Sequence, residues 1–562
     1  MKCFSTYIWN NLAGRASRYV AASSCSPRLP VSYRSERPMS SAVYSSGAPT
    51  RQSGIYAPID ALHRNALERP DFIVMSQGED NWTYERFVNH VRRLGRGLAK
   101  LGVKPGDRVV LHLGNSTAAA IACYATMMIG AIVFPMNCRY APGEVRRLIE
   151  RLRPALYLGH GDVYGGLSDV DTALLPLERR FVVDGFVPDS GVKSWNELFD
   201  AELQPWPSDQ DPDAPIILVS TSGTTSEPKL VVHTQNTISH STAAIVELIE
   251  STAGDVTSGV DLASTPIFHS PGWLQLMVAM TLTRKFVWPK CREFDANAFL
   301  NAIERHRCTI LVATPFGISE LIASQRATPR DVGCLSVCYV AGDACRAELY
   351  DEFEQVFGKT LRNVLGMSEA AGNLKGGLTN KSMQVRLPGT VRIIDEHGND
   401  TKSGEVGELL YSGDHVFRGY WKSPGVIDDV RRDGWFYTGD LVYKDEQDDI
   451  WFVSRKKEII VRDGENIAPV EIEQRLLEHP FAADAAVTTL PDAKLGERIV
   501  GFMKLEADIG DPTPDDVLRS LAPVLADYKI PEFLFFVDHI PRTAWGKADR
   551  RRLRAMATEF IR

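Results

Sequence analysis

The chain has 562 residues, of which 44% are hydrophobic and 24% are charged, and its net charge at pH 7 is −8. This length exceeds what one hydrophobic core usually supports, so we expect two or more domains. The acidic balance argues against a nucleic-acid-binding surface, and the nine cysteines lack the paired spacing of a zinc site.

The first fifty residues differ in composition from the rest of the chain. They contain Lys2 and five arginines against the single acid Glu36, together with many serines. This composition is typical of a mitochondrial transit peptide. The alternatives are a leader without structure, or a true start at Met39. We leave residues 1–50 out of the fold, and we expect a mitochondrial protein if residues 1–38 are a transit peptide and a cytoplasmic one otherwise.

Short apolar runs alternate with amphipathic stretches from Tyr56 to about Val453, which predicts βαβ units and parallel sheets. Residues 117–136 carry no charge over a membrane-spanning length, but Gly130 and Pro135 interrupt them. We therefore expect a buried helix, a turn and a buried strand there. After an acidic turn at residues 445–449, about a hundred residues remain, which suffice for one small α+β domain.

The segment Thr221–Lys229 follows the apolar run Ile216–Val219, which predicts a buried strand leading into a hydroxyl-rich turn. Such a turn suits a polyphosphate, because Gly223 lets the backbone come close, the hydroxyl and N–H groups bond phosphate oxygens, and Lys229 adds positive charge. The spacing of a GTPase P-loop is absent. An ordinary Ser/Thr/Gly loop is the alternative.

Four further motifs follow in order: Gly366-Met367-Ser368-Glu369, Tyr437–Leu441, Arg455–Glu458 with Gly464, and Pro541–Lys547. Together, in this order, the five motifs resemble the adenylate-forming superfamily of acyl-CoA synthetases, luciferases and peptide-synthetase adenylation domains. The resemblance runs from about Ile55 to the C-terminus. It implies an α/β fold, with a large N-terminal domain of parallel-rich sheets over residues 51–455 and a small mobile α+β domain over residues 456–562.

Adenylation joins a carboxylate to the α-phosphate of ATP and expels pyrophosphate, so the site needs cations, a metal and oriented donors that bring two anions together. The resemblance implies ATP and CoA as substrates and Mg²⁺ as the metal, with Glu369 as its ligand. Asp440 would bind the ribose hydroxyls, and Arg455 the ribose and a phosphate. The implied ATP-binding residues are Thr221, Ser222, Gly223, Thr224, Thr225, Lys229, Ser368, Asp440 and Arg455.

The same resemblance makes Lys547 catalytic together with Glu369, because this lysine would bond the substrate carboxylate and a phosphate oxygen at once. It implies a hinge at Lys457, about which the small domain rotates after adenylation, and a thiol channel at Gly464. The implied acyl-pocket residues are His269, Trp273 and Met367. We interpret His269 as a pocket wall and not as a general base.

Two features depart from the family pattern. Leu365 stands where the family usually has an aromatic residue that stacks on adenine, so nucleotide affinity is expected to be lower. The segment between Glu369 and Leu387 is shorter than usual, at the border of the acyl pocket. Ordinary alternatives remain for single residues: a surface carboxylate at a helix start for Glu369, a turn residue for Asp440, and a solvated lysine for Lys547.

The function that these residues favour is an ATP-dependent carboxylic acid–CoA ligase that forms an acyl-adenylate. One alternative is an adenylating enzyme that loads a separate carrier protein. A second alternative is a protein of the same fold that binds nucleotide or acyl ligand without turnover. The mostly apolar pocket residues favour a medium or long acyl chain, or an aryl acid, over acetate.

Overall fold

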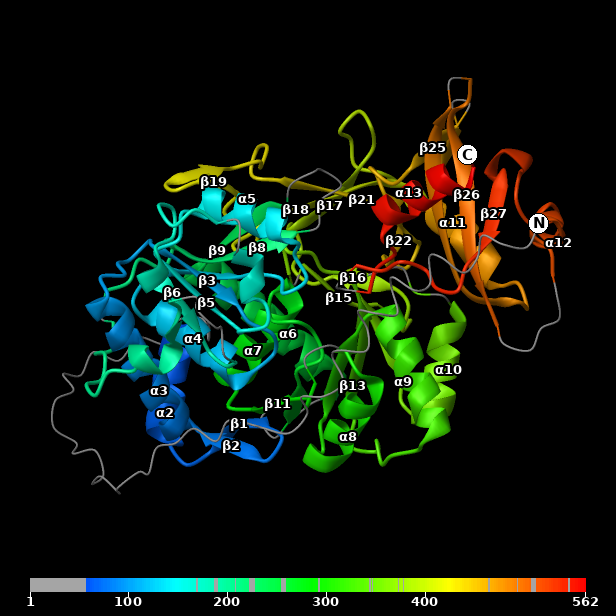
Figure 1. Ribbon diagram of the computed structural model, residues 1–562. Coiled ribbons are helices and arrows are strands. Elements are labelled where there is room, and N and C mark those ends of the chain that lie inside the picture. Colours follow the sequence, from blue (N-terminus) through cyan, green and yellow to red (C-terminus); the bar gives the residue numbers. More distant parts are fainter. Residues whose placement is uncertain are drawn as a thin grey trace, which may run out of the picture. The chain divides into compact units, whose positions relative to one another are not determined.

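The protein is described here by a computed structural model with large N-terminal and smaller C-terminal portions (Figure 1). The described residues are 57–167, 170–185, 191–207, 209–221, 228–253, 259–291, 294–342, 345, 347–371, 373–377, 379–462, 465–492, 494–506, 512–543 and 546–561. They form four β-sheets with helices packed between and around them, which is the expected α/β class.

A nine-stranded sheet forms the first layer, in the order β20-β19-β9-β8-β4-β3-β5-β6-β7. The neighbours from β8 to β7 run parallel, as the sequence predicts, whereas β20, β19, β9 and β8 pair antiparallel. The strands are β3 (Arg108–His112), β4 (Ile132–Pro135), β5 (Leu156–Gly159), β6 (Arg180–Val182), β7 (Lys193–Ser194), β8 (Pro215–Thr221), β9 (Lys229–Thr234), β19 (Tyr420–Ser423) and β20 (Val426–Asp428).

A seven-stranded sheet forms the second layer, in the order β14-β13-β12-β10-β11-β1-β2. All of its pairs are parallel except β1 with β2. The strands are β1 (Ile73–Gln77), β2 (Asp80–Thr83), β10 (Val260–Leu262), β11 (Lys285–Trp288), β12 (Ile310–Ala313), β13 (Val337–Ala341) and β14 (Leu361–Val364).

The helices of these two layers include α6 (Gln235–Ala253) and α7 (Ser270–Thr281), which run side by side in the middle of the large domain (Figure 1). Nine residues on α7 are buried, which explains the apolar character of the whole helix. The other helices are α2 (Pro58–Glu68), α3 (Tyr84–Lys100), α4 (Thr117–Met128), α5 (Pro142–Leu152), α8 (Ala296–His306), α9 (Pro315–Ala327) and α10 (Ala347–Phe357).

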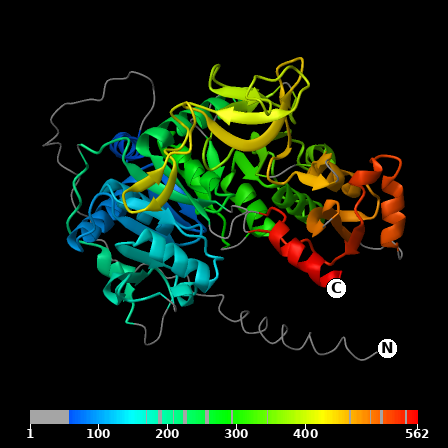
Figure 2. The ribbon, with the colours of Figure 1, turned by 90° about the horizontal axis from the view of Figure 1, so that it is seen from above.

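A six-stranded antiparallel sheet completes the large domain, and Figure 2 shows it at the top of the view. The strands are β15 (Leu374–Gly376), β16 (Met383–Val385), β17 (Val391–Ile394), β18 (Gly407–Tyr411), β21 (Phe436–Lys444) and β22 (Ile450–Arg455). This sheet was not expected from the sequence, because strands such as β21 and β22 combine buried with partly exposed residues and lack the continuous buried runs of the parallel strands.

The C-terminal domain has a sheet of its own, in the order β24-β23-β26-β25 with β27 beside β26. Strand β22 ends at Arg455 and the first strand of this sheet starts at Ile460, and the domain boundary expected after Arg455 stays a prediction. The elements are β23 (Ile460–Arg462), β24 (Glu465–Ile467), β25 (Ala482–Asp492), β26 (Gly496–Leu505), β27 (Phe533–Phe536), α11 (Pro469–Leu477), α12 (Pro514–Leu521) and α13 (Arg550–Phe560).

The uncharged segment 117–136 folds as the sequence predicts, with α4 followed by β4 and a left-handed Gly130 at φ 72° between them. Every side chain of β4 is buried, and α4 lies in the main hydrophobic core. Among the described residues, the structure contains no helix with the length and apolar character needed to span a membrane.

Two glycines of α3 give a matched test of the packing. A Cβ atom at Gly97 would overlap the carbonyl oxygen of Leu198, whereas a Cβ at Gly95 would meet its neighbours at ordinary contact distances of 3.6 Å. We expect Gly97→Ala to lower the unfolding free energy by about 1–3 kcal/mol, because backbone must move. Gly95→Ala should raise it by about 0.5–1 kcal/mol through helix propensity. Thermal unfolding midpoints of the two variants measure these changes. Equal midpoints for Gly97→Ala and Gly95→Ala would contradict the close contact between Gly97 and Leu198.

Candidate active site

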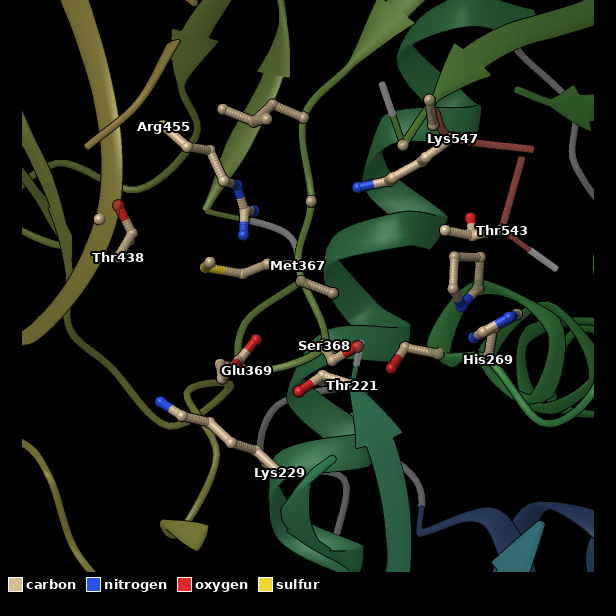
Figure 3. A pocket seen from close by; sticks show the side chains of 18 of the residues that line it. Thr221, Lys229, His269, Met367, Ser368, Glu369, Thr438, Arg455, Thr543 and Lys547 are labelled. Carbon is tan, nitrogen blue, oxygen red and sulfur yellow. The ribbon is translucent and has the colours of Figure 1, made fainter. Parts of the chain in front are cut away.

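One cavity of about 1290 Å³ gathers residues that the sequence places far apart. It is lined from β8, β9, α6, α7 and the seven-stranded sheet, from β21 and β22, and from the C-terminal turn that carries Lys547. Figure 3 shows how the labelled side chains face a common space. The sequence-predicted residues that line it are Thr221, Lys229, His269, Met367, Ser368, Glu369, Arg455, Lys457 and Lys547.

The predicted phosphate loop connects the two strands of a hairpin. Thr221 ends β8, Lys229 begins β9, and the two residues are partners in the antiparallel register. Both line the cavity, so the connection between them starts and ends at its wall. Ser222, Gly223, Thr224 and Thr225 lie outside the described residues, as does Gly464, and their roles stay predictions.

Glu369 is held in the cavity wall by Tyr420. The Tyr420 hydroxyl donates to Glu369 Oε1 at 2.8 Å, and only 8% of Glu369 is exposed, so the alternative of a surface carboxylate at a helix start is wrong. The Lys229 ammonium lies 4.3 Å from the centre of the Tyr420 ring. Partial burial and Lys457 lower the pKa of Lys229, and Glu369 opposes that shift. The sequence analysis missed Tyr420, because it belongs to none of the motifs.

A metal at this site would be shared with the substrate. Among the described residues, no group of three or more Asp, Glu, His or Cys side chains is arranged to hold a metal ion. Glu369 is a single carboxylate that faces the cavity beside Lys229. Mg²⁺ often binds through one or two carboxylates together with substrate phosphates and water, so these residues fit that metal when polyphosphate is present.

Asp440 and Arg455 face each other across β21 and β22, with Arg455 Nε 2.8 Å from Asp440 Oδ1. Asp440 is almost fully buried, and burial raises its pKa to about 6 although Arg455 and Lys547 oppose the shift. Arg455 lines the cavity, whereas Asp440 does not. Ribose binding by Asp440 therefore stays a prediction, and it requires Arg455 to move off the carboxylate.

Lys547 reaches the cavity from a tight turn. The N–H groups of Thr543 and Gly546 donate within this turn, and Gly546 adopts the left-handed φ of 84° that the turn requires. Lys547 and His269 line the same cavity (Figure 3). Burial, followed by the positive charge of Lys547, lowers the pKa of His269 to about 4, so the imidazole is neutral at pH 7. A neutral, half-buried ring that lines the cavity fits the interpretation of His269 as a pocket wall.

The structure corrects the prediction for Trp273. This residue is 1% exposed, packs in the main core with its ring against His233, and is not among the cavity-lining residues. The reason is the helical repeat of α7. Trp273 lies on the opposite side from the face that lines the cavity, which consists of Ser270, Pro271, Leu274, Gln275 and Val278.

A buried histidine that the sequence analysis missed anchors the Ser368 motif. His233 Nε2 lies 2.8 Å from the carbonyl oxygen of Ser368, and because that oxygen only accepts, the imidazole must donate from Nε2. Burial lowers the pKa of His233 to about 4, so the ring is neutral. The only signal in the sequence is a polar residue within the buried run of β9.

Comparison with known proteins agrees with this geometry. The family model described as AMP-binding enzyme matches residues 62–421, and the model of its C-terminal domain matches residues 471–547. The chain belongs to the AMP-binding enzyme family. This result confirms the predicted membership of the adenylate-forming superfamily, with its large N-terminal and smaller C-terminal domains.

Relatives of this AMP-binding enzyme cover nearly its whole length. It is 31% identical to a sulfoacetate–CoA ligase of Cupriavidus necator, over 84% of this chain and 92% of the relative. It is 29% identical to an indoleacetate–CoA ligase of Aromatoleum aromaticum, over 88% and 97% of the two chains. The crystal structure of the anthranilate CoA ligase AuaEII with anthranoyl-AMP matches with a TM-score of 0.78 at 22% identity, covering 91% of this chain and 99% of that one, and shows the shared fold.

The buried Asp440 gives a prediction for pH dependence. Its pKa is raised from 3.8 in the unfolded chain to about 6, so the native state keeps a proton that the unfolded state releases between these values. Asp440 thus contributes stability below about pH 4 that is lost as the pH rises to about 6. We expect the unfolding free energy of the wild type to fall relative to that of Asp440→Asn between about pH 4 and pH 6. Above about pH 6 the difference between the two proteins should stay constant. Unfolding midpoints from pH 4 to 8 measure the difference, and a constant offset would contradict the raised pKa.

Proposed function

We propose that this AMP-binding enzyme is an ATP-dependent carboxylic acid–CoA ligase that acts through an acyl-adenylate. The observation that carries the proposal is one cavity in which Lys229, Arg455 and Lys547 face Glu369, next to a branch with apolar walls. The cationic part suits a polyphosphate and the apolar part suits an acyl group. The relatives named as CoA ligases support the same activity.

In the first half-reaction, a carboxylate oxygen of the acid attacks the α-phosphorus of ATP, and pyrophosphate leaves with the electron pair of the broken P–O bond. Lys547 would bond the carboxylate and an α-phosphate oxygen, which offsets the repulsion between them. Lys229 would hold the outer phosphates from the end of the hairpin loop. Glu369 would hold Mg²⁺, which when bound polarises the phosphate oxygens as a Lewis acid.

In the second half-reaction, the thiolate of CoA attacks the carbonyl carbon of the acyl-adenylate, and AMP leaves. AMP is a good leaving group, so this step needs no general acid from the protein. His269 is half-buried and neutral and would act as a wall between the reacting centre and the solvent. Lys457 follows the last strand of the large domain, where a rotation of the small domain would exchange Lys547 for the Gly464 loop.

The test is acid-dependent exchange of labelled pyrophosphate into ATP, measured for a panel of carboxylic acids with and without CoA. We expect exchange with one class of acid, and AMP and thioester accumulating only when CoA is added. Exchange without thioester formation would favour loading of a carrier protein. No exchange with any acid would contradict the proposal and favour a protein that binds without turnover.

A substitution of Lys547 should affect only the first of the two half-reactions. We expect Lys547→Ala to slow acyl-adenylate formation by about 100-fold or more, because a charge that stabilises the α-phosphate is lost. Thioester formation from added acyl-adenylate should stay near the wild-type rate. The control is Lys504→Ala, which removes an exposed lysine of β26 outside the cavity. Equal loss of both half-reactions would contradict the separate role of Lys547.

Glu369 governs the requirement for metal. We expect Glu369→Gln to raise the Mg²⁺ concentration for half-maximal exchange about tenfold, because one charged ligand is lost. Tyr420→Phe keeps the carboxylate and removes only its 2.8 Å hydrogen bond, so its shift should be smaller. A titration of exchange rate against Mg²⁺ measures both. An unchanged Mg²⁺ dependence in Glu369→Gln would remove this residue from the metal site.

We also propose a mitochondrial location directed by residues 1–38, which are rich in arginine and serine and poor in acids. A fluorescent protein fused after residue 50 should reach mitochondria from a Met1 start and stay in the cytoplasm from a Met39 start. A cytoplasmic signal from both would contradict a transit peptide.

A further inference from the structure

The cavity continues past the cationic site as an apolar branch. It runs between helices α6 and α7 on one side and the face of the seven-stranded sheet on the other. Most of the side chains that form its walls are apolar or aromatic, and most of these are buried. They are Ala244, Ile245, Leu248 and Ile249 on α6, Leu274 and Val278 on α7, and Ile310, Val312, Tyr339 and Val364 on the sheet.

The lining face of α7 gives the length of this branch. It runs from Ser270, next to His269 at the mouth, to Val278 in the last turn but one. At 1.5 Å per residue, this face is about 12 Å long. A fully extended backbone advances about 1.2 Å per bond, and an extended alkyl chain does the same, so the face matches about ten bonds. A single aromatic ring or an acetyl group would fill only the first part.

The deep end of the branch is charged. Asp261 lines the cavity and pairs with Arg284, whose Nε lies 2.8 Å from Asp261 Oδ2, and both side chains are 2% exposed. Gln275 Nε2 donates to the carbonyl oxygen of Leu262 at 2.8 Å, which fixes α7 against the strand that carries Asp261. The branch therefore ends at a buried ion pair.

A second polar contact closes the side of the branch next to α6. The hydroxyl groups of Tyr339 and Thr252 lie 2.8 Å apart, and the Tyr339 hydroxyl also donates to the carbonyl oxygen of Leu248. The ring of Tyr339 is thus held across the sheet face, with 4% of the residue exposed. A chain that grows beyond Val278 meets the Asp261–Arg284 pair, and contact with a buried ion pair is unfavourable for a methyl group.

We propose that the acid is an unbranched, apolar chain of about eight to twelve carbons, and that the Asp261–Arg284 pair sets the upper limit of its length. This inference rests on the proposed function, because it assigns the acyl group of that reaction to the apolar branch. The carboxylate lies at the mouth near Lys547 and His269. The methyl end lies beside Val278, against the ion pair.

The expected specificity profile follows from burial of methylene groups. Each buried CH₂ is worth about 0.8 kcal/mol, so kcat/KM should rise about fourfold per carbon. The rise should stop at about ten to twelve carbons and then turn into a fall. The measurement is acid-dependent pyrophosphate exchange with saturated acids from acetate to stearate, and with benzoate and indoleacetate as aryl probes.

Two variants move the limit in opposite directions. Val278→Phe fills the deep end, so we expect the optimum to shift to acids shorter by several carbons, with hexanoate used at the wild-type level. Leu248→Ala widens the wall, so longer or branched acids should gain. The control is Met277→Phe, which adds the same ring in the same turn of α7, on the face that packs in the core and not in the cavity. Its optimum should not move.

The outcomes separate this inference from the proposed function. A best substrate that is an aryl or short acid would overturn the chain-length inference and leave the ligase proposal intact. A profile without a limit, or an unmoved optimum in Val278→Phe, would remove the ion pair as the limit. Exchange with no acid would overturn both proposals. If Val278→Phe does not fold, the wild-type profile alone decides between a medium chain and the other acids.

Discussion

Repulsion between anions is the constraint on which the site depends. A carboxylate must approach a phosphate, and two unit charges 4 Å apart repel by about 4 kcal/mol at the effective dielectric constant near a protein surface. Cations from separate segments line the cavity and can offset this repulsion. They are Lys229 from a hairpin, Arg455 from the end of the antiparallel sheet, and Lys547 from a C-terminal turn. Two sheets of the large domain and the C-terminal domain each supply one of these cations.

The sequence allowed the prediction of the α/β class and of elements such as α4 and β4, because buried runs and glycine turns are local signals. It did not allow the prediction of the six-stranded antiparallel sheet, in which β21 buries alternate residues and β16 and β17 bury only one or two residues each. That sheet pairs strands far apart in the chain, and only the tertiary structure shows that Asp440 and Arg455 face each other.

Site residues that belong to sequence motifs could be predicted, whereas residues whose place in the site depends on tertiary packing could not. Glu369 and Lys547 stand in motifs, and the structure places both in one cavity. Tyr420 holds Glu369 from another strand and gave no signal. Trp273 was predicted as an acyl-pocket residue, but the helical repeat of α7 places it in the core. The same repeat presents Val278 to the apolar branch of the cavity.

The most direct test of an acyl-adenylate route follows the oxygen atoms of the acid. The acid is labelled with ¹⁸O in both carboxylate oxygens and incubated with ATP, Mg²⁺ and CoA. The masses of the products are then measured by mass spectrometry. Attack of the carboxylate on the α-phosphorus leaves one labelled oxygen in AMP and one in the thioester. AMP without label, or label in pyrophosphate or inorganic phosphate, would contradict the proposal that the cavity brings the carboxylate to the α-phosphate.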